Sequence, residues 1–572
     1  SFPTRRSSAL ECPVLRLPEL AEWIRSLEAS GVVASAGIQN KERSPLVLDG
    51  DGNLFMYRYW QYEMIIDEWI RQRVDAGSEL LNETRHRVNI DLLRESLNRL
   101  FGKTQEYDWQ KLAAASGVLR PFTVITGGPG TGKTTTVVKM LTVIIEQFLD
   151  KDIIPAIALA APTGKAAGRM KETIKQQREQ IECSNEVLDV IPEETYTLHR
   201  LLGTVKGKSH FRHHDKNPLP YDVVIVDESS MVDVALMARL MKAMPQHSFL
   251  VLIGDRDQLA SVEAGAVLGD ICDSGNYHGY TAEWNKTLET AGTVLPEEYL
   301  KSDESPVADS VIMLRKNYRF GADSGIGTFS NATRVSCLGD ALDVLEDNIY
   351  DDISLVTYDN YAGMQKLLST LVTDGFKPYL HAKSPDEAFM RYAGFTILTP
   401  FRTGPFGIES LNYLAEKILH RAELIRGTSP WYSHRPVMVM VNDYSLKLYN
   451  GDVGIVLPGD TAGQRKDMPP VAWFQEPGGS FRSISPSRLH NIQTSYAMTV
   501  HKSQGSEFEH VVLVLPPALT GNYERLLTRE LLYTAVTRAR SRVTILGNKD
   551  IVSFMIENPT MRASGLRGLL WK

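Results

Sequence analysis

Gly127-Gly128-Pro129-Gly130-Thr131-Gly132-Lys133-Thr134 is the stretch of this 572-residue sequence that decides its fold. It follows the apolar run 122–125 and precedes residues 137–145, which have the character of a helix. A glycine-rich loop of this spacing between a strand and a helix is the pattern of a P-loop, in which backbone N–H groups and the helix N-terminus surround phosphates. The sequence therefore predicts an α/β fold that binds a nucleoside triphosphate.

The residues of this loop have separate expected roles in binding ATP. Lys133 is expected to reach the β- and γ-phosphates, and the Thr134 hydroxyl is expected to ligate Mg²⁺. The residues expected to hold the nucleotide here are Gly127, Gly128, Pro129, Gly130, Thr131, Gly132, Lys133, Thr134 and Thr135. Upstream, the amide of Gln110 is suited to the N6 and N7 edge of adenine, and the alternative interpretation is a helix residue that faces solvent.

Two carboxylates, Asp227 and Glu228, follow the apolar run 223–226 and so lie at the C-terminal edge of a predicted parallel strand, where such sheets bind ligands. We expect Asp227 to hold Mg²⁺, directly or through water, and Glu228 to activate the water that attacks the γ-phosphate. Gln258, after the next strand, is placed to touch both this water and the γ-phosphate. Acid pairs at strand ends are common, and it is the P-loop that makes this pair informative.

Arginines are required where phosphoryl transfer spreads negative charge over the equatorial oxygens of the phosphate. The candidates are Arg319, in Asn317-Tyr318-Arg319-Phe320, and Arg538, in the stretch 533–540. The alternative interpretation of each is a solvated surface group. Together with Lys133, Glu228 and Gln258, they form the predicted catalytic set.

Short apolar runs alternate with helical stretches from Phe122 onward, as expected of a parallel sheet covered by helices on both faces. The strands expected in a first lobe are 122–125, 156–160, 223–226 and 249–253. Those expected in a second lobe are 395–398, 511–515 and 543–546. The runs 437–441, 453–457 and 471–474, with a turn at 450–452, predict a small antiparallel barrel inserted into the second lobe.

The N-terminal part carries no catalytic motif. Leu20, Trp23, Ile24 and Leu27 have helical spacing, and a turn-rich stretch at 49–53 separates two short apolar runs, which predicts a hairpin. We therefore expect a docking or packing domain. The predicted division of the chain is 1–108 for this N-terminal domain, 109–300 for the first lobe, 301–432 and 491–572 for the second lobe, and 433–490 for the insertion.

Composition excludes several classes of protein. The chain is 43% hydrophobic and holds no run of about 18 apolar residues that would span a bilayer. Its four cysteines form no CxxC pair, which argues against a disulfide framework, structural zinc or an iron–sulfur cluster and favours a reducing cytoplasm. The net charge of −7 shows no global sign of nucleic-acid binding. The chain starts with Ser1 and lacks the pattern of a signal peptide, so we expect native N-terminal residues to be missing.

Further motifs follow the P-loop in a fixed order. They are LAAPTGKAAGRM from Leu159, TLHRLLG from Thr197, VDESSM from Val226, GDRDQLASVEAGAVLGDIC from Gly254, NYRFGADSGIG from Asn317, YAMTVHKSQGSEF from Tyr496 and LLYTAVTRAR from Leu531. In wording and order this set resembles superfamily 1 helicases of the RecD group. The resemblance covers about residues 105–550, while residues 1–100 match only in general character.

The resemblance implies an ATP-dependent 5′–3′ DNA helicase and single-strand translocase. Its implied fold is two RecA-like P-loop NTPase lobes with a small N-terminal domain, a pin-like hairpin at about 203–220 and an SH3-like β insertion in the second lobe. It also implies that Arg319, Arg538 and Gln110 have the roles considered above. The implied partners are the RecB and RecC subunits of a heterotrimer, the RecBCD enzyme or exonuclease V. That complex would process double-strand breaks toward repair by homologous recombination in the bacterial cytoplasm.

Binding of single-stranded DNA without sequence preference needs phosphate contacts and faces on which bases stack. Residues 162–165 follow the second strand of the first lobe, and residues 399–402 occupy the equivalent strand end in the second. Residues 499–505 would link a DNA-facing hydroxyl to the nucleotide, which would couple the two sites. The residues expected to contact DNA are Pro162, Thr163, Lys165, Thr197, His199, Thr399, Arg402, Thr499, His501 and Gln504.

Several alternatives stay open at this point. The basic stretch 206–216 is either a solvated loop or a pin that contacts duplex DNA ends. The chain is either a subunit of the trimer or a standalone RecD-like helicase, although the helix-hairpin-helix extension of the standalone proteins is not visible. An ATP-binding structural subunit would be expected to have lost Glu228, Gln258 or an arginine, and all are present. A nuclease would need clustered carboxylates away from the ATP site, and we find no convincing cluster.

Overall fold

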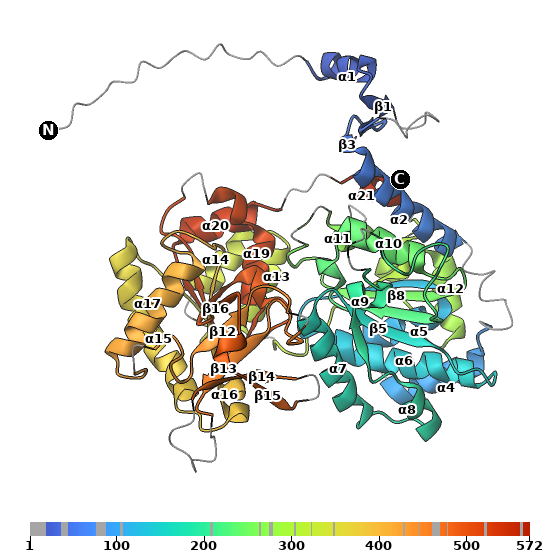
Figure 1. Cartoon of the computed structure of the whole chain (residues 1–572). Coiled ribbons are helices and arrows are strands. Elements are labelled where there is room, and N and C mark those ends of the chain that lie inside the picture. Colours follow the sequence, from blue (N-terminus) through green and yellow to red (C-terminus); the bar gives the residue numbers. More distant parts are fainter. Residues whose placement is uncertain are drawn as a thin grey trace.

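The fold is described from a computed structural model (Figure 1). The structure describes residues 19–35, 44–75, 87–102, 107–205, 207, 210–261, 263, 265–273, 278–301, 305–321, 323–346, 349–426, 429–443, 445–459, 469–476, 479–519, 523–560 and 564–571. Of the basic stretch expected to form a pin, Lys206 and Lys208 lie outside these residues. Its described part holds two isolated antiparallel bridges, Thr204 with Phe211 and His214 with Asn217.

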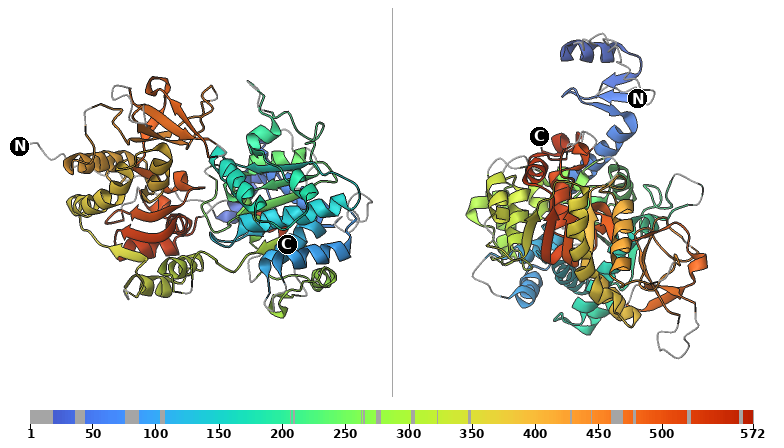
Figure 2. Two further views of the ribbon diagram at one scale, coloured as in Figure 1. Left: turned by 90° about the horizontal axis from the view of Figure 1, so that it is seen from below. Right: turned by 90° about the vertical axis from the view of Figure 1, so that its left-hand side faces the viewer.

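The N-terminal module projects from the rest of the molecule (Figures 1 and 2). The predicted helix is α1 (Leu20–Ala29), and the predicted hairpin is the antiparallel pair β2 (Leu46–Leu48) and β3 (Leu54–Met56), so both predictions are confirmed. A third strand, β1 (Val33–Ser35), pairs with β2 in parallel. Helix α2 (Tyr57–Asp75) then leads into the first lobe and packs against α10 (Val234–Ala243).

The first lobe is built on a six-stranded sheet in which all pairs are parallel. In sheet order its strands are β6 (Thr195–Thr197), β5 (Ile157–Ala161), β7 (Val223–Val226), β8 (Phe249–Gly254), β4 (Phe122–Thr126) and β9 (Val311–Met313). The four strands predicted for this lobe are confirmed, and β6 and β9 were not predicted. Because the carboxyl ends of parallel strands share one edge, the loops after β4, β7 and β8 meet there.

Helices cover both faces of this sheet, and neighbouring residues of one strand enter different cores. Ile225 packs with one set of helices, whereas Val224 and Val226 pack with the other. The first set is α4 (Ile90–Phe101), α5 (Trp109–Leu119), α6 (Lys133–Leu149), α7 (Gly164–Arg178), α8 (Asn185–Val190) and α12 (Ala282–Thr290). The second is α2, α9 (Leu198–Leu202), α10 and α11 (Val267–Cys272).

The second lobe has a five-stranded, all-parallel sheet. In sheet order its strands are β10 (Ile353–Val356), β19 (Ala539–Leu546), β18 (Phe508–Val514), β11 (Phe395–Thr399) and β17 (Ala497–Thr499). Its helices are α13 (Gly325–Arg334), α14 (Leu338–Glu346), α15 (Tyr361–Leu380), α16 (Pro385–Tyr392), α17 (Ile408–Arg421), α18 (Val500–Ser503), α19 (Arg529–Val536) and α20 (Lys549–Glu557). The molecule is therefore an α/β protein with two parallel sheets, as predicted.

The insertion is a five-stranded antiparallel sheet with a small core of its own. In sheet order its strands are β15 (Phe481–Ile484), β14 (Val471–Gln475), β13 (Val453–Leu457), β12 (Pro436–Val439) and β16 (Ile492–Thr494). The antiparallel arrangement agrees with the prediction. Among the described residues β15 and β16 are edge strands that do not pair with each other, so the sheet is open where we expected a barrel.

The lobes divide differently from the expected boundaries at both ends of the second lobe. Strand β9 belongs to the first sheet, so the first lobe extends past residue 300 to Met313. At the other end, α21 (Leu566–Leu570) returns to the first lobe and packs against α2 and α11 (Figure 1). Short 3-10 helices span Ser229–Met231, Glu297–Tyr299, Ala308–Ser310, Pro486–Arg488 and Glu524–Leu526. Within the described residues, every helix is too short or too polar to cross a bilayer.

Candidate functional site

The P-loop turns from β4 into α6 through glycines in the left-handed region, with φ of 81° at Gly130 and 78° at Gly132. A side chain on Gly130 would overlap Arg319, and one on Gly132 would overlap the amide of Gln110. Lys133 Nζ donates to the carbonyl oxygens of Gly127, at 2.6 Å, and Gly128, at 3.0 Å. The loop therefore holds Lys133 over the backbone that would bind phosphate. Glycine is needed at positions 130 and 132 because any side chain there would collide with Arg319 or Gln110.

One cavity of about 240 Å³ brings the predicted catalytic residues together. It is lined by Pro129, Gly130, Gly132, Lys133, Thr134, Thr135, Ala166, Arg169, Met170, Thr173, Asp227, Glu228, Gln258, Arg319, Glu507 and Arg538. The lining residues from Pro129 to Gln258 belong to the first lobe. Glu507 and Arg538 belong to the second lobe, and Arg319 belongs to the segment between the two sheets. The cavity is therefore closed by both lobes.

Asp227 and Glu228 lie at the carboxyl end of β7, as predicted. Asp227 Oδ1 accepts a hydrogen bond from the Glu228 backbone N–H at 2.8 Å, and Glu228 has a left-handed φ of 51°. Burial raises the pKa of Asp227, and the charge of Glu228 raises it further. The Thr134 hydroxyl and the Asp227 carboxylate line the same cavity, and such oxygen donors are the ligands that Mg²⁺ prefers, so the residues present fit this ion.

Gln258 is buried at the carboxyl end of β8 with only half of its amide paired. Its Nε2 donates to Asp255 Oδ2 at 2.9 Å, whereas its Oε1 is buried and has no partner among the described residues. The same Asp255 oxygen accepts from the Tyr533 hydroxyl of the second lobe at 3.1 Å. The Gln258 amide is thus held by Asp255, which also joins the two lobes. Gln258 Oε1 remains available to accept a hydrogen bond from a group in the cavity.

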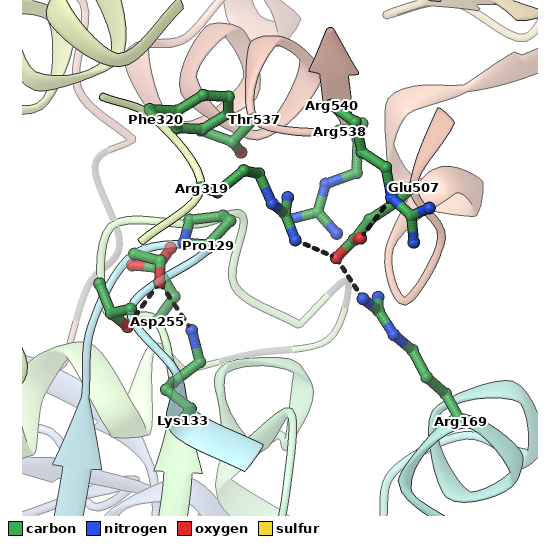
Figure 3. Close-up of polar contacts among 12 residues, drawn as sticks. Pro129, Lys133, Arg169, Asp255, Arg319, Phe320, Glu507, Thr537, Arg538 and Arg540 are labelled. Atoms are coloured by element: carbon green, nitrogen blue, oxygen red, sulfur yellow. Dashed lines mark hydrogen bonds and ion pairs between the residues drawn. The ribbon is translucent and has the colours of Figure 1, made fainter. Parts of the chain in front are cut away.

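Arg319 and Arg538 reach the cavity from outside the first lobe. Arg538 is 3% exposed, and its Nε donates to the Thr534 carbonyl at 3.2 Å. Arg319 Nη2 donates to the Glu507 carboxylate at 2.7 Å, and its buried Nη1 has no partner among the described residues (Figure 3). The guanidinium groups therefore lie where phosphate charge would be neutralised.

A second, smaller cavity of about 100 Å³ adjoins the P-loop at Thr131. Gln110, near the start of α5, lines it and donates its amide N–H to the Thr131 carbonyl at 3.1 Å. The other lining residues are Tyr107, Asp108, Trp109, Leu314, Arg315, Lys316 and Tyr318. The Arg315 guanidinium carbon lies 4.9 Å from the centre of the Trp109 ring. Flat side chains next to an amide group suit a purine base.

A third cavity, of about 820 Å³, lies in the second lobe against the insertion. Of the residues predicted to contact DNA, it is lined by Arg402, Thr499 and His501. Apolar and aromatic side chains accompany them, including Met438 and Tyr523. The combination of cationic groups and flat apolar side chains in one groove fits a nucleic-acid strand.

The predicted threonines of the first lobe lie at helix N-termini. Thr163 caps α7 by accepting from the Ala166 N–H, and Thr197 caps α9 by accepting from the Arg200 N–H. Pro162 precedes the α7 cap, and His199, on α9, is exposed with its ring 5.7 Å from that of Phe211. Helix N-termini attract phosphate groups.

Lys165 lies on α7 and contacts the Ser506 hydroxyl of the second lobe. Burial lowers the pKa of Lys165 to about 8. The lysine expected to contact DNA is therefore engaged between the lobes in this structure.

Two residues predicted to contact DNA lie elsewhere. Thr399 is fully buried, and its hydroxyl donates to the Phe406 carbonyl at 2.6 Å, because the chain folds back over it after β11. Gln504 is 8% exposed, and its amide donates to the Leu259 carbonyl of the first lobe at 2.9 Å. Neither side chain lines the large cavity, and Gln504 is a contact between the lobes instead.

Comparison with known proteins places this architecture in a family. A profile described as an AAA domain matches residues 110–264, and one described as a UvrD-like helicase C-terminal domain matches residues 494–546. The RecBCD enzyme subunit RecD of Haemophilus influenzae is 34% identical over 547 residues, which cover 91% of this chain and 80% of that protein. Its counterpart from Mycobacterium tuberculosis is 36% identical and covers 96% and 84%. The chain belongs to the RecD family.

Two further similarities bear on this RecD-family chain. The ATP-dependent RecD2 DNA helicase of Deinococcus radiodurans is 29% identical, over 74% of this chain but only 47% of that longer protein. A solved structure of Pif1 helicases at forked double-stranded DNA is 18% identical with a TM-score of 0.39, and it covers 78% of this chain and 94% of that one.

Sequence reasoning missed three residues that complete the site of this RecD-family protein. Arg169 and Glu507 line the nucleotide cavity, and Tyr533 joins the lobes through Asp255. All three lie within motifs quoted from the sequence, but no local pattern distinguishes them from ordinary surface residues. Their roles depend on contacts between residues more than 270 positions apart.

Proposed function

We propose that this chain is the 5′–3′ DNA helicase and single-strand translocase subunit of a RecBCD-type helicase-nuclease, driven by ATP hydrolysis. The observation that carries the proposal is the single cavity in which Lys133, Glu228 and Gln258 of the first lobe face Arg319 and Arg538. A site assembled from two lobes changes when they open or close, which a motor requires and a passive nucleotide site does not.

In the proposed hydrolysis, the water oxygen bonds to the γ-phosphorus as the bond to the β,γ-bridging oxygen breaks and ADP leaves. Glu228 accepts a proton from this water, and Gln258 Oε1 accepts a hydrogen bond from it. Lys133, Arg319 and Arg538 stabilise the negative charge that develops on the phosphate oxygens. Mg²⁺, held by Thr134 and Asp227, would neutralise charge between the β- and γ-phosphates. The adenine lies in the cavity beside Gln110, whose amide oxygen accepts from its N6 amino group.

The DNA strand would run across both lobes. In the first lobe it would meet the N-termini of α7 and α9, with Pro162, Thr163, Thr197 and His199. In the second it would enter the large cavity at Arg402, Thr499 and His501. Because these contacts would be to the phosphate backbone and base faces of the DNA, we expect the chain to bind single-stranded DNA with little preference for sequence. Opening and closing of the lobes would move the two grips relative to each other along the strand.

Partner subunits, in this proposal RecB and RecC acting with the chain in the bacterial cytoplasm, would dock on the N-terminal module. This module projects from the lobes (Figure 1). Its side chains Leu20, Trp23 and Met56 are 70%, 53% and 58% exposed. Exposed apolar side chains on one small module are typical of a surface that another protein covers. The complex as a whole would bind the ends of duplex DNA.

The test is unwinding of duplexes that carry either a 5′ or a 3′ single-stranded tail. We expect the chain, co-expressed with its RecB- and RecC-type partners, to unwind the 5′-tailed substrate when any ATP-hydrolysing site in those partners has been inactivated. Lys133→Gln should abolish ATP hydrolysis and this unwinding, because the charge that holds the β- and γ-phosphates is lost, while the partners still co-purify. Unwinding confined to 3′ tails, or unchanged by Lys133→Gln, would refute the proposal.

A further inference from the structure

A strip of the second lobe, residues 504–507, contacts the first lobe beside the nucleotide cavity. Ser506 meets Lys165, and Glu507 is paired with Arg169, both from α7. Lys165 and Arg169 are four residues apart, so they lie on one face of this helix. Helix α7 therefore faces the strip with two cationic side chains, and one of these cations meets a carboxylate.

The Glu507 carboxylate binds three arginines (Figure 3). Its Oε1 accepts from Arg319 Nη2 at 2.7 Å and from Arg169, and its Oε2 accepts from Arg540 Nε at 3.1 Å. The side chain of Glu507 is only 9% exposed. Burial acts to raise the pKa of Glu507, but the charges of Arg169 and Arg319 outweigh it and hold that pKa well below its usual range. The group is therefore a fixed negative charge among cations.

The contacts of Arg319 indicate that the Glu507 carboxylate orients its guanidinium group. One terminal nitrogen of its guanidinium is held by Glu507, and the other, Nη1, is buried and has no partner among the described residues. A guanidinium is planar and rigid, so a carboxylate that holds one nitrogen also sets the direction of the other. Arg319 lines the nucleotide cavity, where a phosphate oxygen is the acceptor that would satisfy Nη1.

We propose that Glu507 is the positioning residue for Arg319, and that its pairing with Arg169 makes this positioning depend on closure of the lobes around DNA. The proposal rests on the function proposed above. Arg169 is rigidly joined to the Thr163 cap through α7, and Glu507 follows the α18 helix that begins after Thr499. A strand that contacts Thr163 in the first lobe and Thr499 in the second would therefore set the separation of Arg169 and Glu507, and with it the direction of the Arg319 guanidinium.

The first test is Glu507→Gln, which keeps the size of the side chain and removes its charge. Arg169, Arg319 and Arg540 would then repel one another, and Arg319 would lose its set direction. We expect kcat for ATP hydrolysis in the presence of single-stranded DNA to fall about tenfold or more, as when one preorganised charge is removed from an active site. The KM for ATP should change by less than about threefold, because Lys133 and the loop still hold the phosphates.

The matched control is Glu509→Gln, two residues along the chain. Glu509 lies 3.6 Å from Arg540 and is 53% exposed, but it does not line the nucleotide cavity. Its loss should leave the DNA-stimulated kcat unchanged. A general effect of removing one acidic group from this segment would lower the rate of both variants.

A second variant, Arg169→Gln, tests the link between the lobes. We expect it to lower the ratio of the DNA-stimulated rate to the DNA-free rate. The double variant with Glu507→Gln should be no slower than Glu507→Gln alone, because residues that act as one unit are not additive. Purely additive losses would mean that the two residues act separately, and would overturn the link. If Glu507→Gln fails to fold, as judged by thermal melting and co-purification with the partners, the Arg169→Gln ratio decides the matter.

The outcomes separate this proposal from the function on which it rests. If the wild-type complex hydrolyses ATP no faster with DNA, the proposed function fails. If the wild type is stimulated and Glu507→Gln is stimulated to the same kcat, only the role of Glu507 fails. A large rise in KM with kcat retained would also overturn it, since Glu507 would then act in binding ATP.

Discussion

Arg319 and Gln258 each bring to the nucleotide cavity one buried polar atom that has no partner in the part of the chain that the structure describes. A buried polar group without a hydrogen bond costs about 1–3 kcal/mol, so a ligand that pairs with these two atoms would remove that cost. Arg319 Nη1 is a donor and Gln258 Oε1 is an acceptor. These are the two kinds of group that a phosphate oxygen and an attacking water require.

Gly130 explains why the loop can bring Arg319 so close. An alanine there would have to adopt a φ of 81° and would overlap both Arg319 and the side chain of Asn317. The left-handed backbone alone costs about 1–2 kcal/mol. We predict that Gly130→Ala lowers kcat for ATP hydrolysis at least about tenfold, since Arg319 must move away from the phosphate.

The control for this substitution is Gly168→Ala. Gly168 lies within α7, has an ordinary helical backbone, and has no atom within 4 Å of the added methyl group. This change should leave hydrolysis unchanged and increase stability by about 0.5–1 kcal/mol, as alanine does in helices. Equal loss of activity in both variants would contradict the argument from Gly130.

At the scale of elements, sequence patterns predicted the long buried strands, and among the shortest strands they predicted only β2 and β3, which flank the turn at 49–53. Strand β7 has the bounds that its continuous run of valine and isoleucine indicates. Strands β6, β9 and β17 have only three residues each, and their pairing depends on the strands beside them rather than on their own sequence. Hydrophobic periodicity carries no signal for elements of this length.

The same distinction applies to the site. The P-loop and the acid pair after β7 could be predicted because strand, turn and helix follow one another locally. The roles of Glu507 and Arg169 could not be predicted, since these two residues lie 338 positions apart in the sequence and meet only where the lobes approach each other. Thr399 was expected on the DNA path, but the chain that folds back over it takes its hydroxyl.

Helix α21 is the element whose place was least expected. After the second lobe, the chain returns to the first, where Leu566 and Leu570 are fully buried and Trp571 Nε1 donates to the Asp270 carbonyl at 2.9 Å. The backbone of Gly565 also donates to the buried Glu63 of α2 at 2.9 Å. Helix α21 therefore packs between α2 and the first lobe, and these contacts hold the N-terminal module in place.

We predict that Leu570→Ala destabilises this junction by about 2–5 kcal/mol, the cost of emptying a buried leucine site. The measurement is the free energy of unfolding of the transition that reports the first lobe, followed with denaturant. Leu519→Ala, at a position 39% exposed, is the control and should have little effect. Equal effects of the two changes would show that α21 contributes no packing to the lobe.

For the whole molecule, the two parallel sheets form separate bodies (Figures 1 and 2), and residues of both lobes line the nucleotide cavity. They are connected by the segment after β9 and again by the segment between α20 and α21. Gln504 contacts Leu259 and Tyr533 contacts Asp255 between the lobes, and Gln504 lies two residues after Lys502, which lines the large cavity of the second lobe. In the proposed function, nucleotide and DNA would therefore act on the same interface.

The most direct test of this account is the rate of ATP hydrolysis by the chain as single-stranded oligonucleotide is added. The chain is assembled with its partner subunits, in which any ATP-hydrolysing site has been inactivated. The account predicts that the rate rises with oligonucleotide concentration to a plateau, because the strand favours the closed lobes that complete the catalytic site. A rate that is the same with and without oligonucleotide would contradict it.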